Sequence, residues 1–255
     1  MPSLRFLAPA LLTLAFGAAP VTASAQSFSD SQRGEIEQIV KHYLLAHPEI
    51  LEEVSTELSK RQATAEALKH ETAVTENANS IFNSPRGVTL GNKNGDVTFV
   101  EFFDYNCGYC KRAMADMLEL LKSDHKLKVV LKEFPVLGQS SVEAAQVAVA
   151  ARMQDPTGKK YLDFHQKLLG GRGQADRARA LAAAKEAGFD IAKIQKDMTS
   201  PEVRATLEEN FKLAESMGMN GTPSYVIGKQ VVVGAVGLET LKEKINTARC
   251  GKASC

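Results

Sequence analysis

The chain has 255 residues, 44% of them hydrophobic, and a formal net charge of +1 at pH 7. This near balance of acids and bases gives no support to nucleic-acid binding through bulk charge. The chain is long enough to bury a sizeable core. Its four cysteines are too few for disulfides to stabilise a fold of this length. A role in a chemical reaction therefore explains the cysteines better than structural cross-linking does.

Residues 1–25 have the pattern of a signal peptide. Arg5 gives a positive start, Phe6–Phe16 is apolar, and Ala23–Ala25 matches a small-residue cleavage site. The alternative is a membrane anchor, but the apolar run contains Pro9 and is shorter than the roughly 20 residues that span a bilayer. We expect cleavage before Gln26 and a periplasmic protein in an oxidising compartment.

Residues 26–84 form a separate helical region in this interpretation. Apolar residues recur at helical spacing on both sides of Pro48, where one helix should end and another begin. These residues are Ile36, Ile39, Val40, Tyr43, Leu44, Ile50, Leu51, Val54 and Leu58. They could pack on the chain's own catalytic domain or on identical residues of other subunits. We favour the second, a homo-oligomer (trimer or dimer) formed through residues 26–80.

A strand followed by a helix is expected over residues 97–121. Val97–Phe103 is β-branched and aromatic, which is typical of a buried strand. The pattern breaks at Asp104–Gly108 and continues with apolar residues on one helical face. Those residues are Met114, Met117, Leu118 and Leu121.

Two cysteines lie where this strand meets this helix. Cys107 is at or just before the helix N-terminus, where unpaired backbone N–H groups and the helix dipole lower the pKa of a thiol. Cys110 follows after two residues and can reach back to resolve a mixed disulfide formed at Cys107. The pattern predicts a redox dithiol.

The rest of the chain predicts an α/β domain with a helical insertion. A short strand at Val88–Leu90 comes first, and a strand at Lys126–Phe134 closes a right-handed βαβ unit. Strands resume at Ser224–Ile227 and Val231–Val233, before a helix at Leu238–Ala248. Between them we expect helices at Val142–Met153, Tyr161–Leu169, Ala175–Ala187, Ile191–Met198 and from Pro201 to near Gly218.

Three separated motifs resemble those of the DsbA-like thioredoxin-fold disulfide oxidoreductases: Glu101–Cys110, Lys132–Pro135 and Gly221–Tyr225. The run Leu44–Glu53 is similar to the N-terminal region of the suppressor-of-copper-sensitivity (ScsC-like) thiol–disulfide proteins, some of which are trimers. The resemblance implies a thioredoxin fold over residues 85–255, a helical insertion at about 139–218, and a preceding N-terminal α-helical stalk.

The resemblance also implies roles for individual residues. Cys107 would be the attacking thiolate and Cys110 the buried resolving thiol. Glu101 stands where the family places a buried acid, which could accept the proton of Cys110. The alternative for Glu101 is a solvated glutamate, or one paired with Lys132. Pro223 matches the family's cis-proline, whose loop faces the dithiol and could pair its backbone with an extended substrate segment.

The residues around the dithiol indicate whether the protein isomerises or oxidises disulfides. DsbA itself has a histidine between its cysteines, whereas Gly108-Tyr109 and Thr222 resemble the substrate-binding residues of the DsbC-like disulfide isomerases. We therefore favour an isomerase, although the DsbC-type N-terminal domain is missing. The alternatives are a DsbA-like oxidase and a protein that sequesters copper(I) on its thiols.

The expected partners follow from this interpretation. They are secreted or periplasmic substrate proteins and a membrane redox partner that resets the dithiol, and we expect no nucleic acid, cofactor or resident metal. Cys250 and Cys255 could bridge each other as a local disulfide. The five histidines lack metal-ligand spacing, and we expect each at a surface or cap position.

Overall fold

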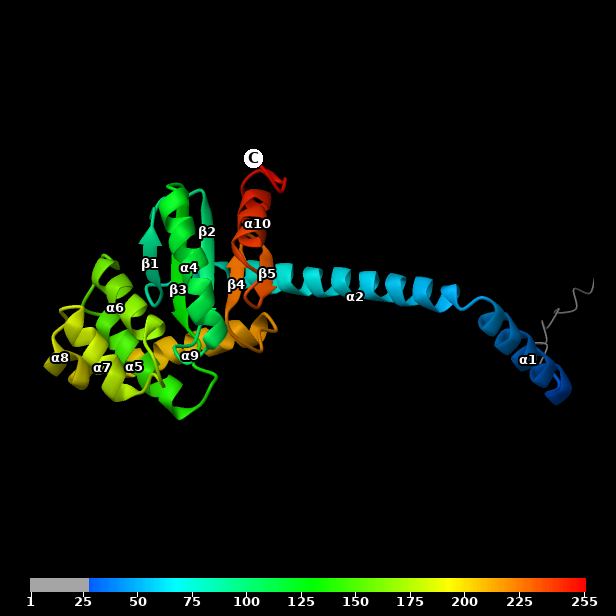
Figure 1. Cartoon of the computed structure of the whole chain (residues 1–255), viewed down its shortest axis with the longest axis horizontal. Helices are drawn as coiled ribbons and strands as arrows, with labels where there is room; N and C mark the ends of the chain where they lie inside the picture. Colours follow the sequence, from blue (N-terminus) through cyan, green and yellow to red (C-terminus); the bar gives the residue numbers. More distant parts are fainter. Residues whose placement is uncertain (1–27) are drawn as a thin grey trace, which may run out of the picture. The chain divides into compact units, whose positions relative to one another are not determined.

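The computed structural model of the protein describes residues 28–255 (Figure 1). The expected signal peptide lies outside the described residues. The chain divides into two compact units, one reaching Leu58 and the other beginning at Ser59. No helix in the described range has both the length and the apolar character needed to cross a bilayer.

The first unit consists of α1 (Asp30–Ala46) and the start of α2 (Glu49–Glu76). A capping box begins α1: the Ser29 side chain accepts the Gln32 N–H, and the Gln32 side chain accepts the Ser29 N–H. No residue of α1 is buried. The large apolar residues exposed in this unit are Phe28, Ile36, Ile39, Val40, Tyr43, Leu45, Leu51, Val54 and Leu58.

The second unit is built on a sheet with strand order β1-β3-β2-β4-β5 in the described chain. Its strands are β1 (Val88–Gly91), β2 (Val97–Phe103), β3 (Leu127–Glu133), β4 (Ser224–Ile227) and β5 (Gln230–Val233). As predicted, β2 runs parallel to β3, with α4 (Gly108–Ser123) between them in sequence. The second N-terminal helix ends at Glu76 and is followed by a short α3 (Ala78–Phe82).

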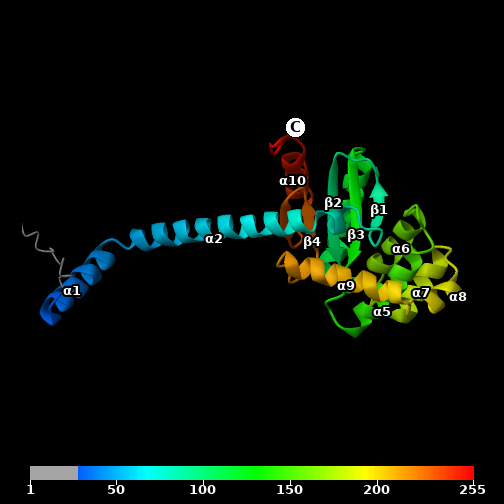
Figure 2. The same ribbon diagram turned by 180° about the vertical axis from the view of Figure 1, so that it is seen from behind.

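Alternate residues of β2 face opposite sides of the sheet. Phe99 and Phe103 pack in the cluster that contains residues of α4 and of α10 (Leu238–Cys250). Val100 and Phe102 pack in a second cluster, with residues from the C-terminal part of α2, from α3 and from α9 (Pro201–Ser216). Helix α4 lies in front of the sheet in Figure 1, and α9 in front of it in Figure 2. Because side chains alternate along a strand, odd-numbered residues of β2 face the cysteine helix.

The helical insertion leaves the sheet after β3 and returns before β4, which agrees with the fold expected from the sequence. It comprises α5 (Gln139–Arg152), α6 (Lys159–Gly170), α7 (Arg177–Glu186), α8 (Ile191–Asp197) and α9. The alanine- and valine-rich α5 is mostly buried and contacts α6, α7, α8 and α9. It therefore forms the centre of the insertion (Figure 1).

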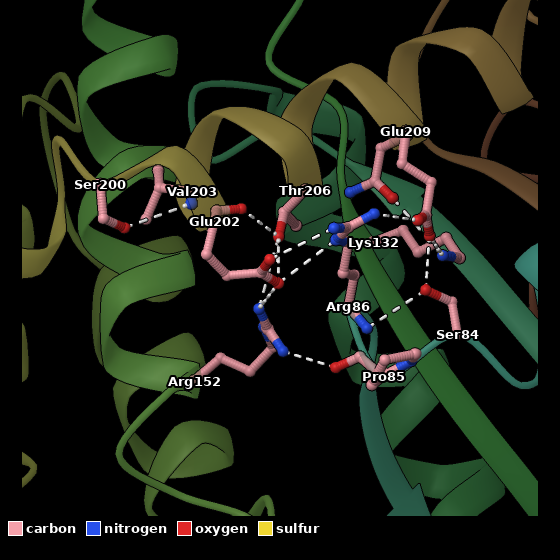
Figure 3. Close-up of polar contacts among 11 residues, drawn as sticks. Ser84, Pro85, Arg86, Lys132, Arg152, Ser200, Glu202, Val203, Thr206 and Glu209 are labelled. Carbon is pink, nitrogen blue, oxygen red and sulfur yellow. Dashed lines mark hydrogen bonds and ion pairs between the residues drawn. The ribbon is translucent and has the colours of Figure 1, made fainter.

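A buried lysine anchors α9 to the face of the sheet opposite α4. The Lys132 side chain is fully buried, and its Nζ lies 3.5 Å from Glu209 Oε1 and 3.4 Å from Asn210 Oδ1. Glu209 also accepts hydrogen bonds from Arg86 (2.9 Å) and Ser84 (2.5 Å). Figure 3 shows these groups converging from β3, α9 and the segment before β1. A buried charge is tolerated when it is paired and hydrogen-bonded in this way.

Replacing Glu209 with alanine should destabilise the second unit by about 3 kcal/mol, because it leaves the buried Lys132 charge without its carboxylate. Urea unfolding of the two proteins measures the difference. The Glu209→Ala/Lys132→Met double variant should recover part of the loss. Glu239→Ala is the control, since the Glu239 side chain is 81% exposed and its pair with Lys242 should contribute no more than about 1 kcal/mol. A loss equal to that of the control would contradict the prediction.

Candidate active site

Cys107 lies at the N-cap of α4, where the sequence predicted it. Its backbone N–H donates to the Asp104 carbonyl (3.0 Å) and closes a four-residue turn between β2 and α4, the Asp104–Cys107 turn. Its sulfur accepts the Cys110 backbone N–H at 3.3 Å. Both cysteines are free thiols, and Cys110 is fully buried while Cys107 is 6% exposed.

The two thiols have opposite pKa shifts. Hydrogen bonds lower the pKa of Cys107 to about 6, and the largest contribution comes from the Cys110 thiol. The Thr222 side chain and backbone N–H groups lower it further, while partial burial opposes the shift. Burial raises the pKa of Cys110, and its hydrogen bond with Cys107 adds to that effect. One thiol can therefore attack near neutral pH while the other stays protonated.

The loop before β4 faces the dithiol because β4 pairs with β2 in antiparallel register, Ser224 lying opposite Phe102. The Thr222–Pro223 peptide bond is cis, the geometry that the family resemblance implies. The Cys107 thiol donates to the Thr222 carbonyl at 3.1 Å. The carbonyl that precedes the cis-proline thus lies directly against the sulfur that would react.

Glu101 is buried on the dithiol side of the sheet. It is an odd-numbered residue of β2 and only 2% exposed, and its Oε2 atom has no hydrogen-bond partner. Burial raises its pKa to about 8, assisted by the negative charges of Cys107 and Asp116. It is neither solvated nor paired with Lys132. Lys132 lies beside Phe102 in the sheet register and binds Glu209 on the opposite face.

The surface beside Cys107 is open. A side-chain carbon added at Gly108 would meet no atom within 4 Å. Tyr109 is 60% exposed, and the Arg112 guanidinium lies 4.4 Å from the centre of its ring. Lys111 donates to the Gly171 carbonyl of the insertion. A polypeptide could therefore approach Cys107 past these residues.

Two polar residues of the Asp104–Cys107 turn have roles that the sequence analysis missed. Buried Asp104 accepts the backbone N–H groups of Val136 (2.9 Å) and Leu137 (3.0 Å). The Asn106 side chain exchanges two hydrogen bonds with the backbone of Ala175, accepting its N–H (2.7 Å) and donating to its carbonyl (2.9 Å). The one available signal was a pair of short polar residues next to a cysteine in an apolar stretch.

The remaining cysteines form a separate feature. Cys250 and Cys255 are joined by a disulfide of 2.06 Å in the exposed segment at the end of α10. Within residues 28–255, no group of three or more His, Cys, Asp or Glu side chains could hold a metal ion. The expectation of surface or cap histidines is wrong for His165, which is 1% exposed because it packs between aromatic rings of the core.

The match to the DSBA-like thioredoxin domain family spans residues 98–246, which includes the dithiol, the insertion and the cis-proline loop. The chain belongs to that family. Residues 32–65 match the copper resistance protein ScsC N-terminal domain, which agrees with the resemblance seen in the first helices.

Similar solved structures agree with this family assignment. A thioredoxin-like oxidoreductase from Silicibacter pomeroyi is 44% identical, with a TM-score of 0.64 over 67% of this chain and 96% of its own. Proteus mirabilis ScsC in a transitional conformation is 27% identical, with a TM-score of 0.64 over 88% of this chain and 98% of its own.

Curated sequences are more distant. The disulfide bond formation protein D of Bacillus subtilis is 24% identical over 64% of this chain and 77% of its own length. The chain spans only about a quarter of the length of the Na⁺/H⁺ antiporters that it also matches.

Titration of the reduced protein should show one thiolate forming with a midpoint near pH 6, because Cys107 ionises there while Cys110 stays protonated. Thiolate absorbance at 240 nm, which rises with pH through the midpoint, measures this. Cys110→Ala removes the largest stabilising hydrogen bond and should move the midpoint upward; Cys107→Ala should abolish the step. A midpoint near the ordinary thiol value of roughly 8.5 would contradict the assignment.

Proposed function

We propose that the protein is a periplasmic thiol–disulfide oxidoreductase, active chiefly as a disulfide isomerase on secreted proteins. The observation that carries this proposal is the asymmetric dithiol: Cys107 has a lowered pKa and lies against the Thr222 carbonyl, and Cys110 is buried behind it. Membership of the DSBA-like family supports the redox chemistry.

The exchange would proceed in two steps. The Cys107 thiolate attacks one sulfur of a substrate disulfide, forms a mixed disulfide and releases the other sulfur as a thiolate. An isomerase lets that freed thiolate attack elsewhere in the substrate until Cys107 is displaced. If rearrangement stalls, Cys110 attacks Cys107, which closes the Cys107–Cys110 disulfide and leaves the substrate reduced. A membrane redox partner would then return the two electrons to the dithiol.

The side chains near the dithiol support isomerase over oxidase. Gly108-Tyr109 brings no cation between the cysteines, and the pKa of Cys107 is lowered by hydrogen bonds. A thiolate that is only moderately stabilised makes a weaker oxidant. Thr222 and Pro223, together with Gly108 and Tyr109, would form the substrate-binding surface. An extended substrate strand could pair with the backbone of the cis-proline loop.

Glu101 would serve as the base for Cys110 in this scheme. Its carboxyl group is neutral at pH 7 when Cys107 is a thiolate, since burial and the Cys107 charge both raise its pKa. In the mixed disulfide Cys107 carries no charge, so one of these causes is removed. The carboxylate becomes easier to form at the step that needs it.

The N-terminal region, residues 26–84, would assemble identical subunits around the catalytic domain of residues 85–255. Its large apolar residues are left exposed in the described chain, and burying each would contribute on the order of 2 kcal/mol. The match to the ScsC N-terminal domain supports this role. Assembly would bring several dithiols together, which favours repeated capture of one misfolded substrate.

The isomerase proposal is tested by recovery of activity from scrambled ribonuclease. The full mature chain should restore activity, and a chain lacking residues 26–80 should lose this ability while still oxidising reduced peptides. Because Val74 of α2 is in the core, the cleaner comparison is Ile39→Lys/Val54→Lys, which changes two exposed residues of the first unit. If the mature chain and the shortened one both oxidise peptides and neither unscrambles ribonuclease, the protein is a DsbA-like oxidase.

The role of Glu101 is tested by the pH dependence of mixed-disulfide resolution. In the unmodified protein the rate should rise with pH through a midpoint below about 8, because only ionised Glu101 can accept the Cys110 proton and the mixed disulfide lacks the Cys107 charge that helps to raise the Glu101 pKa. Glu101→Gln should flatten this rise and slow resolution at least about tenfold. Rapid-quench release of a peptide bound to Cys107 measures both values. Glu119→Gln, at an exposed position of α4, is the control, and identical profiles for the two variants would refute the role.

A further inference from the structure

Four buried polar side chains form a continuous hydrogen-bonded chain behind the Asp104–Cys107 turn. Tyr161 donates its hydroxyl proton to Glu133 Oε1 at 2.5 Å. The Tyr105 hydroxyl oxygen lies 3.1 Å from that of Tyr161 and 3.3 Å from Nδ1 of His165. None of the four residues is more than 6% exposed. We call Glu133, Tyr161, Tyr105 and His165 the buried polar chain.

The buried polar chain joins three parts of the fold. Glu133 ends β3, Tyr161 and His165 lie one turn apart on α6, and Tyr105 is in the turn that leads to Cys107. Aromatic rings enclose it: the His165 ring centre lies 4.7 Å from that of Phe103. Buried polar groups cost free energy unless they are hydrogen-bonded, so this arrangement fixes the relative positions of the three parts.

The protons of the buried polar chain can be placed from its chemistry. Burial lowers the pKa of His165 to about 3, so its imidazole is neutral near pH 7, with one nitrogen donating and the other accepting. With the proton on Nδ1, His165 donates to Tyr105, Tyr105 to Tyr161, and Tyr161 to Glu133. Every bond then runs in the same direction, and each polarises the next.

Tyr105 connects the buried polar chain to the reactive sulfur. It is the second residue of the turn closed by the Cys107 N–H and the Asp104 carbonyl. The same turn sets the distances from the Cys107 sulfur to the Cys110 N–H (3.3 Å) and to the Thr222 carbonyl (3.1 Å). Asp104 and Asn106 attach the turn to neighbouring loops, and Tyr105 attaches it to the inserted helix α6.

We propose that the residues of the buried polar chain are positioning residues for Cys107, holding the turn so that its sulfur stays within reach of the Cys110 N–H, which stabilises the thiolate. Through them, the inserted helix α6 tunes a thiol that it does not touch. The inference rests on the proposed function in one respect: Cys107 is taken as the attacking thiol. The side chains of the buried polar chain bond to one another and are at most 6% exposed, so they act on Cys107 through the turn.

The test compares Tyr105→Phe and Tyr161→Phe in the full mature chain. Each keeps an aromatic ring and removes one hydroxyl group. Two measurements are made: the midpoint of Cys107 thiolate formation and the equilibrium constant of the dithiol with glutathione. Both variants should weaken the thiolate and shift the glutathione equilibrium about three- to tenfold toward the protein disulfide, making the dithiol less oxidising. Their double variant should shift it less than the sum of the two.

Two control variants separate positioning from general stability, which urea unfolding measures in all of them. Phe164→Leu alters packing against the rings of Tyr105 and Tyr161 without changing a polar group. Thr206→Val removes a buried hydroxyl from α9, where it donates to the Glu202 carbonyl. Both should unfold more easily than the unmodified protein and keep its thiolate midpoint and glutathione equilibrium.

The proposal is overturned if the tyrosine variants are destabilised like the controls and keep both redox values of the unmodified protein. If Tyr105→Phe does not fold, Tyr161→Phe carries the same test from α6. Failure of the proposed function would look different: the unmodified protein itself would then form no thiolate near pH 6 and would not exchange with glutathione.

Discussion

The short turn between β2 and α4 is the constraint on which the site depends. Its closing hydrogen bond, from the Cys107 N–H to the Asp104 carbonyl, places the sulfur at the start of a helix. The side chains of the turn bond outward in different directions: Asp104 to the loop after β3, Tyr105 to α6, Asn106 to Ala175, and Cys107 to the loop before β4. A segment too short to hold a conformation alone is thus fixed by its neighbours.

The sheet register determines which groups share the space behind this turn. In the parallel pairing of β2 with β3, Glu101 lies opposite Leu131 and Phe103 opposite Glu133. Side-chain alternation directs Glu101 and Glu133 to the face covered by α4 and the insertion, and directs Lys132 to the face covered by α9. Burial on that face raises the pKa of both carboxyl groups, and the charge of Lys132 opposes the shift of Glu133 only in part.

The sequence was sufficient for the strand–helix junction, the order of the elements and the insertion, because each depends on local periodicity or on motifs within a few residues. The bounds of β2 and β4 match the prediction, and those of most helices differ by a few residues. The burial of Glu101 was left open between two alternatives, since only the register shows that Lys132 faces away from it.

What the sequence could not reveal depends on residues far apart in the chain. His165 becomes buried because Phe103 and Tyr105, some 60 residues earlier, surround its ring. Asn106 finds its partner at Ala175. No short-range pattern encodes such pairs. Adjacent charged residues in an apolar strand, Lys132 and Glu133, were the only local sign that polar networks lie on both faces of the sheet.

The inserted helices are therefore more than a detachable module. A chimera that received the α5–α9 segment of a relative would acquire new loops at the rim of the site, and it would also lose the partners of Tyr105 and Asn106. Grafting for a new substrate range would alter the chemistry of the recipient's dithiol at the same time. Only a graft that carries matching residues in the Asp104–Cys107 turn would exchange recognition and leave reactivity as it was.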